Sequence, residues 1–124
     1  QSVQVMGASD VVLAASGTAA LEATMLRKPM VVAYKVSTLS YMLAKLLIRT
    51  EYISLPNNLI DEPLIPEVLQ REVSGWRLCR EISLILDNPE RSRGMIGKLE
   101  SIYKQLKNNA NQRAAKKILD LVER

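Results

Sequence analysis

The chain has 124 residues, of which 48% are apolar and 24% are charged, and its formal net charge is +4. This length supports one modest hydrophobic core and therefore at most one domain. One cysteine, Cys79, and no histidine exclude an internal disulfide, a zinc site built from Cys and His, and a Ser-His or Cys-His catalytic pair. No signal peptide is visible, and no apolar stretch reaches the roughly 20 residues that span a bilayer, so we expect a cytoplasmic protein.

Residues 11–34 predict a strand, a turn, a helix and a second strand. The apolar run at residues 11–15 meets a small-residue turn at residues 16–18, a helix is expected at residues 18–27, and a second apolar run follows at residues 30–33. The expected inner positions of the helix are Leu21 and Met25. This is the parallel crossover unit of an α/β sheet. We therefore predict an α/β fold with a partial Rossmann-like parallel sheet and flanking helices.

The turn between the first strand and the first helix is a candidate phosphate site. Ser16, Gly17 and Thr18 are the residue types that present free backbone N–H groups and hydroxyls at a helix N-terminus, where phosphate binds well. Glu22 lies one turn into the helix, and its carboxylate can reach a ribose hydroxyl if a nucleotide diphosphate occupies the turn. The alternative is a plain strand-to-helix turn with a Ser or Thr N-cap. The pattern alone does not choose between the two interpretations.

The middle of the chain predicts an apolar helix and a third strand. The helix is expected at residues 39–49, capped by Ser37 or Ser40, and it is apolar on nearly every side. Such a helix is either buried against protein, which we expect, or covered by another chain or a lipid. A short third strand is expected at residues 52–55, and the Pro-Asn-Asn sequence at residues 56–58 should end it.

The following segment predicts a loop and two helices. The loop is expected at residues 61–66, and a helix should begin at Pro66 or Glu67. Ser74 can cap a second helix at residues 76–86. The inner positions of that helix are expected to be Leu78, Ile82 and Ile85.

The C-terminal segment is basic. Residues 91–124 contain nine Lys and Arg against three acids, a net charge of +6, whereas residues 1–90 have a net charge of −2. Asn88-Pro89-Glu90 predicts the start of a long helix that is amphipathic through Leu99, Ile102, Tyr103 and Leu106. Residues 108–111 should separate it from a last helix, whose inner positions are expected to be Ala114, Ala115, Ile118, Leu119 and Val122. The segment is either a pair of solvated helices or a surface for a phosphorylated ligand or an anionic membrane. Nucleic acid is not expected, because the segment has one aromatic residue and no recognised binding motif.

A family resemblance runs over nearly the whole chain. ASDVVLAASGTAALEATMLRKPMVVAYK at residues 8–35, the apolar helix, and EYISLPNNLIDEPLIPEVLQRE at residues 51–72 resemble the C-terminal part of bacterial lipid-A-disaccharide synthases. NANQRAA at residues 109–115 also fits the ending of that family. SGTAALE alone is shared loosely with other UDP-sugar enzymes of the two-Rossmann-domain class. The combination with SLPN and PEVLQ is far more specific.

The resemblance implies a glycosyltransferase of the GT-B fold that lies peripherally at the cytoplasmic face of the inner membrane. It would transfer 2,3-diacylglucosamine from UDP to 2,3-diacylglucosamine 1-phosphate and form the β-1,6 disaccharide of lipid A. The expected partners are UDP-diacylglucosamine, diacylglucosamine 1-phosphate and the anionic membrane surface, with no cofactor and no metal. Residues 1–90 would belong to the nucleotide-sugar domain, and the basic helices of residues 91–124 would cross to an N-terminal domain or to a partner.

The resemblance also assigns site residues. The UDP-sugar would contact Ser16, Gly17, Thr18, Glu22, Asn57, Glu67 and Gln70. Asn57, in SLPN, matches a family position important for activity and is the candidate catalytic residue, although a turn-making Asn is the alternative. As a site residue without a core role, Asn57 should be replaceable by Ala with a stability change within about 1 kcal/mol. For Glu67 and Gln70 the alternative is an ordinary exposed first helical turn.

The catalytic base would lie in an N-terminal half that precedes these residues, so we expect the chain alone to be inactive. With few strands and an apolar helix, it should self-associate or exchange elements with a second copy. Two other classes of function stay open. One is a different UDP-sugar enzyme, such as an epimerase. The other is a non-enzymatic domain that packs or dimerises through its apolar helix.

Overall fold

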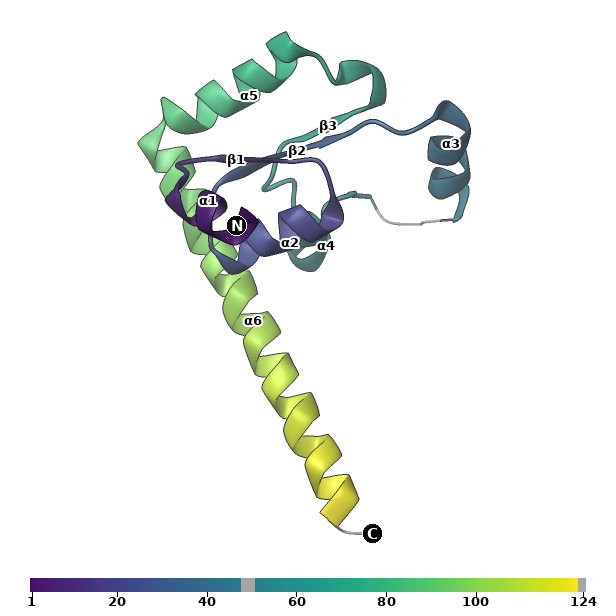
Figure 1. Cartoon of the computed structure of the whole chain (residues 1–124), viewed down its shortest axis with the longest axis vertical. Coiled ribbons are helices and arrows are strands. Elements are labelled where there is room, and N and C mark those ends of the chain that lie inside the picture. The colour runs from purple at the N-terminus through teal and green to yellow at the C-terminus, as the bar shows by residue number, and fades with distance from the viewer. Residues whose placement is uncertain (48–50, 123–124) are drawn as a thin grey trace.

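The computed structural model describes residues 1–47 and 51–122 as an α/β fold around a three-stranded parallel sheet (Figure 1). The strands are β1 (Val12–Ala14), β2 (Met30–Tyr34) and β3 (Glu67–Leu69), in the order β1-β2-β3. In register, Val12 lies opposite Met30, and Val32 lies opposite Glu67. The predicted fold class and the first two strands are confirmed.

Helices cover both faces of this sheet. They are α1 (Ser2–Ala8), α2 (Gly17–Met25), α3 (Thr38–Leu47), α4 (Leu55–Ile60), α5 (Gly75–Leu86) and α6 (Pro89–Val122), with a 3-10 turn at η1 (Gln70–Glu72). Figure 1 shows α5 on one side of the sheet and α2 and α4 on the other. The central strand β2 is therefore enclosed, and its first three residues, Met30, Val31 and Val32, are at most 1% exposed. Within the described ranges, no helix is both long enough and apolar enough to cross a bilayer.

Small residues form the inner face of α2. Ala20, Ala23 and Thr24 are buried, and the Thr24 hydroxyl donates to the Ala20 carbonyl across 2.7 Å, so no polar group is left unpaired. The prediction of Leu21 and Met25 as inner positions is wrong, because they are 36% and 42% exposed. The larger side chains would hold the helix away from the sheet, whereas the small ones let it approach closely.

The third strand lies elsewhere than predicted. Residues 51–54 form no strand, and Pro56 lies in the first turn of α4, after the N-cap Ser54. Proline is tolerated there because the first helical N–H groups have no intrahelical acceptor. The strand β3 instead occupies Glu67–Leu69, where a helix was predicted, after a loop at residues 61–66 that is confirmed. Strand propensity in a three-residue segment is weak compared with its pairing to β2.

The two C-terminal helices begin where predicted. The Ser74 hydroxyl accepts the Arg77 N–H at 3.2 Å, and the Asn88 side-chain oxygen accepts the Arg91 N–H at 3.1 Å. The predicted inner residues pack as expected: Ile85, Leu99 and Ile102 are buried, and Leu78, Ile82 and Leu106 pack against them.

The predicted break at residues 108–111 is wrong, since α6 is continuous from Pro89 to Val122 and extends beyond the rest of the fold (Figure 1). Asn is only a moderately poor helix former, and the Lys, Gln and Ala residues around it favour the helix. The inner positions expected in a separate last helix, Ala114, Ala115, Ile118, Leu119 and Val122, have side chains that lie outside the described residues.

The apolar helix α3 lies at the periphery of the molecule. Its cap is confirmed, because the Ser37 hydroxyl accepts the Ser40 N–H at 3.2 Å. The prediction that this helix is buried against protein is wrong for the residues that the structure describes. Four apolar side chains are 50–81% exposed: Leu39, Met42, Leu43 and Leu46. Residues 48 and 49, at the end of the predicted helix, lie outside the described residues.

Candidate functional site

The turn after β1 opens α2 as predicted. Ser16 is the N-cap residue, and its hydroxyl accepts the Ala19 N–H at 3.1 Å, while its carbonyl accepts the Ala20 N–H at 3.0 Å. Ser16, Gly17 and Thr18 are all exposed. A helix N-terminus with this partial positive charge attracts an anion. The turn is therefore open to a ligand at the carboxyl edge of the sheet, which is where ligands bind in α/β folds.

A tyrosine that the sequence interpretation missed completes this turn. Tyr34 is the last residue of β2, and its hydroxyl oxygen accepts the Gly17 N–H at 3.2 Å. A phenol that accepts one hydrogen bond still has its own O–H to donate. Tyr34 thus places a further donor beside the N-terminus of α2. The signal in the sequence was a hydroxyl-bearing aromatic residue at the carboxyl end of a buried parallel strand.

Gln70 lies at the end of β3 and joins it to the segment after β2. Its side-chain oxygen accepts the Val36 N–H at 2.8 Å, and its side-chain nitrogen donates to the Val36 carbonyl at 2.9 Å. The backbone of Gln70 has a positive φ of 50°, and the residue begins the 3-10 turn η1, not the α-helical turn considered from the sequence. Gln70 is therefore at the carboxyl edge with its amide group already bonded to backbone.

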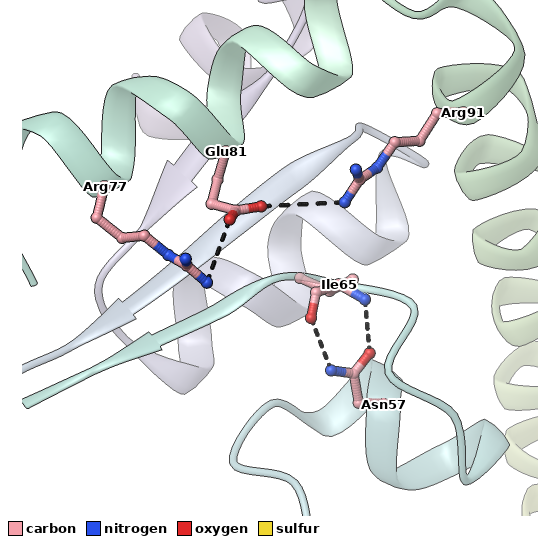
Figure 2. A network of polar contacts seen from close by, with 5 residues as sticks. All are labelled: Asn57, Ile65, Arg77, Glu81 and Arg91. Atoms are coloured by element: carbon pink, nitrogen blue, oxygen red, sulfur yellow. Dashed lines mark hydrogen bonds and ion pairs between the residues drawn. The ribbon is translucent and has the colours of Figure 1, made fainter. Parts of the chain in front are cut away.

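Asn57 belongs to a second, buried cluster (Figure 2). Its side-chain oxygen accepts the Ile65 N–H at 2.8 Å, and its side-chain nitrogen donates to the Ile65 carbonyl at 2.9 Å and to a Glu67 carboxylate oxygen at 3.0 Å. Asn57 is 0% exposed. Its amide oxygen and both amide hydrogens thus have protein partners, and the side chain fixes the loop that leads into β3.

The Glu67 carboxylate binds the N-terminus of α4. One oxygen accepts the Ser54 N–H at 2.7 Å, and the other accepts the Ile53 N–H at 2.9 Å. A carboxylate in this position is stabilised by unpaired N–H groups and by the helix dipole. Glu67 is therefore the first residue of a strand and a structural partner of α4, in place of the exposed helical residue considered from the sequence.

The burial of Asn57 overturns the expectation about its stability. In an Ala variant the Ile65 N–H and carbonyl would lose their partners inside the protein, and each buried unpaired group costs about 1–3 kcal/mol. Asn57 borders a cavity, but at 0% exposure its side chain presents no accessible surface to a ligand there. An effect of Asn57 on activity would consequently act through the positions of Ile65 and Glu67.

A cavity of about 310 Å³ adjoins this cluster and is lined in part by Tyr52, Asn57 and Glu67. Desolvation, and then the nearby carboxylates of Glu51 and Asp61, raise the pKa of the Tyr52 phenol above its ordinary value.

An ion-pair network lies on another wall of the same cavity (Figure 2). The Glu81 carboxylate is 3.3 Å from the Arg77 guanidinium and 4.0 Å from that of Arg91, and Glu81 is only 7% exposed. This network joins α5 to the start of α6. The sequence interpretation did not predict it, because Arg91 approaches Glu81 only when the two helices pack.

The sequence-predicted site residues thus fall into two groups. Ser16, Gly17 and Thr18 share the carboxyl edge of the sheet with Tyr34, and Gln70 follows β3 at that edge. Asn57 and Glu67 form the buried cluster beside α4. Glu22 is half-buried in the second turn of α2.

Comparison with known proteins identifies the chain's relatives. The family model described as lipid-A-disaccharide synthetase matches residues 1–121. The chain is 42% identical over 123 residues to the lipid-A-disaccharide synthase of Hahella chejuensis, covering 99% of this chain and 31% of that protein. It is 39% identical to the synthase of Alcanivorax borkumensis, covering 99% of this chain and 32% of that protein. It is 41% identical to a lipid-A-disaccharide synthase of Haemophilus influenzae, covering 97% of this chain and 32% of that protein.

The chain spans about a third of the length of these curated relatives. The matches extend over both groups of candidate residues, since the family model covers the turn after β1, α4 and β3. The chain belongs to the lipid-A-disaccharide synthase family.

Proposed function

We propose that this chain is the C-terminal, nucleotide-sugar part of a GT-B glycosyltransferase. The complete enzyme, a longer protein of the relatives' length that contains this chain, transfers 2,3-diacylglucosamine from UDP to 2,3-diacylglucosamine 1-phosphate. The observation that carries the proposal is the exposed N-terminus of α2, capped by Ser16 and flanked by the Tyr34 hydroxyl at the carboxyl edge of a parallel sheet. Ligands of α/β folds bind at the carboxyl edge of the sheet, and the UDP carrier is assigned to that edge.

The diphosphate of UDP is assigned to the turn at Ser16, Gly17 and Thr18. An anion there gains roughly 0.3–1 kcal/mol from the helix dipole and about 1.5–3 kcal/mol from each charge-assisted hydrogen bond. The Tyr34 O–H is in place to donate to a phosphate oxygen, because its oxygen already accepts from Gly17. Glu22, on the next turn of α2, is assigned to the ribose hydroxyls.

The other site residues are assigned positioning roles. Gln70 holds the end of β3 against Val36, and so fixes the loop that borders the sugar nucleotide. Asn57 and Glu67 hold α4 on the sheet. The catalytic base is assigned to the part of the complete enzyme that precedes these residues, and α6 is assigned to a contact with that part or with a partner chain in a homo-oligomer.

The complete enzyme is further proposed to lie peripherally on the cytoplasmic face of the inner membrane. Both substrates carry acyl chains, and the segment of residues 91–124 has a net charge of +6. Basic segments are attracted to the anionic lipids of that surface.

Calorimetric titration of the complete enzyme with UDP tests the nucleotide site. Uridine, which lacks the diphosphate, is the matched control ligand. The proposal predicts that UDP binds at least about tenfold more tightly than uridine, the ratio that corresponds to one charge-assisted hydrogen bond. Equal binding of the two ligands, or no binding of UDP, would contradict the proposal and favour the non-enzymatic alternative.

A further inference from the structure

One face of α3 presents a continuous apolar stripe, formed by Leu39, Met42, Leu43 and Leu46. The spacing i, i+3, i+4 and i+7 places these side chains on one face of a helix. They are 70%, 64%, 50% and 81% exposed, respectively. Large apolar side chains gathered on an exposed helix face mark a surface that docks onto something.

The charged residues that neighbour the stripe in the sequence are all basic. No acidic residue occurs between Glu22 and Glu51, whereas this segment contains Arg27, Lys28, Lys35, Lys45 and Arg49. Two of these have partners in the body of the fold, since Arg27 pairs with Glu100 and Lys28 donates to the Ser9 carbonyl. In the sequence, Lys35 precedes α3, Lys45 lies within it, and Arg49 follows it. An apolar stripe among basic residues is the pattern of a helix that lies in the interface of an anionic bilayer.

The position of α3 relates this stripe to the candidate site. The helix follows the carboxyl end of β2, where Tyr34 borders the turn at the start of α2. Figure 1 shows α3 beyond that edge of the sheet, joined to β2 by an extended segment, and it makes few contacts with the other described elements. A surface that held α3 would lie on the same side of the molecule as the proposed sugar-nucleotide site.

We propose that the α3 stripe docks the enzyme on an anionic membrane by inserting into the headgroup region, beside the site that receives the lipid substrates. This inference rests on the proposed function, which supplies the acylated substrates. At 10 residues, α3 is too short to cross a bilayer, which takes roughly 20 residues. A second copy docked through the same stripe would bring two acid-free, basic segments together, and their repulsion favours the anionic lipid surface over self-association.

Flotation of the complete enzyme with lipid vesicles tests the proposal. Vesicles of phosphatidylcholine alone and vesicles that also contain phosphatidylglycerol are compared. The wild type should float with the anionic vesicles and bind the zwitterionic ones much less. Leu39→Ser combined with Leu46→Ser should lower partitioning to the anionic vesicles by about tenfold or more, because two leucines leave the interface.

The matched control is Trp76→Ser combined with Leu86→Ser, which removes two similarly exposed apolar side chains from α5 and should leave partitioning unchanged. A second stripe variant, Met42→Ser with Leu43→Ser, should behave like the first, and circular dichroism verifies that each variant is folded. Retained flotation of both folded stripe variants would overturn the proposal. Equal loss in the α5 control, or a change in oligomeric state caused by the stripe variants, would also overturn it.

Failure of this inference is distinguishable from failure of the proposed function. With UDP in titration and with substrates in detergent micelles, the stripe variants should retain nucleotide binding and turnover, because no bilayer is involved. Wild-type enzyme that neither binds UDP nor forms disaccharide in micelles would contradict the proposed function. Wild-type enzyme that does both, while its stripe variants still float, would contradict only the membrane role of α3.

Discussion

The Gly17 N–H donates to the Tyr34 hydroxyl across 3.2 Å, which joins the first turn of α2 to the carboxyl end of β2. Two consecutive elements of the crossover unit are thereby held at the point where the ligand is proposed to bind. The bond occupies a helix N–H that an isolated helix would leave unpaired. It also orients the phenol so that its own proton is available at the same place.

Tyr34→Phe should therefore weaken UDP binding by about 0.5–1.5 kcal/mol, the usual net value of one hydrogen bond. The ring itself, half-buried against the core, is kept, so the melting temperature should change little. Tyr103→Phe is the control. It also removes one tyrosine hydroxyl, but from a ring on α6 that lies under the Arg27 guanidinium, away from the turn. Calorimetry that finds the same UDP affinity in wild type and Tyr34→Phe would exclude a role for the hydroxyl.

The two serine caps of α2 and α5 allow stability to be separated from binding. Ser16→Ala and Ser74→Ala each remove one hydroxyl that accepts a backbone N–H, so each should cost about 0.5–2 kcal/mol of unfolding free energy. Only Ser16→Ala should also weaken UDP binding, since Ser74 caps a different helix. Urea unfolding and UDP titration of both variants measure the two effects. A parallel loss of UDP affinity in Ser74→Ala would show that the binding effect is only a consequence of lowered stability.

Asn57→Ala should destabilise the protein by about 2–5 kcal/mol, because the Ile65 N–H and carbonyl and the Glu67 carboxylate all lose a partner. Urea unfolding followed by circular dichroism gives the value. Asn58→Ala is a neighbouring control, in which the lost side-chain nitrogen donates to the Tyr52 and Ser54 carbonyls just before α4. If Asn57→Ala abolished turnover with an unfolding free energy within about 1 kcal/mol of wild type, the side chain would have to act on the substrate directly.

Glu81→Gln should lower the unfolding free energy by about 1–3 kcal/mol, because two guanidinium groups lose the buried carboxylate between them. Glu100→Gln, which removes a half-exposed carboxylate paired with Arg27, should cost at most about 1 kcal/mol. Thermal unfolding of the two variants gives the comparison. Equal small losses would show that the Arg77–Glu81–Arg91 network does not hold α5 to α6.

Hydrophobic pattern and cap residues predicted the parts of the fold that are governed by local sequence. The β1–α2–β2 unit and the starts of α5 and α6 follow from apolar runs bounded by Ser16, Ser74 and Asn88. The strand β3 could not be predicted in this way, because its three residues have little local preference and their conformation is fixed by pairing with β2. The inner face of α2 was missed because Ala20, Ala23 and Thr24 are small, whereas apolar size was the criterion applied.

The candidate site shows the same division. The turn at Ser16 was predicted because its residues are adjacent in the sequence. The Tyr34 contact was not predicted, since it spans 17 residues and depends on the register of β1 with β2. Likewise, the hydrogen bonds of Asn57 to Ile65 and of Glu67 to the Ser54 N–H form only when the intervening loop has folded. The spacing of residues in the sequence therefore gives no indication of them.

A crystal structure of the complete enzyme with UDP bound tests the central claim most directly. We predict a phosphate oxygen within about 3.2 Å of the Thr18 N–H, with the Tyr34 hydroxyl still accepting from Gly17 and donating to the same phosphate, and with Glu22 at the ribose. UDP bound elsewhere, with no phosphate at the start of α2, would contradict this prediction.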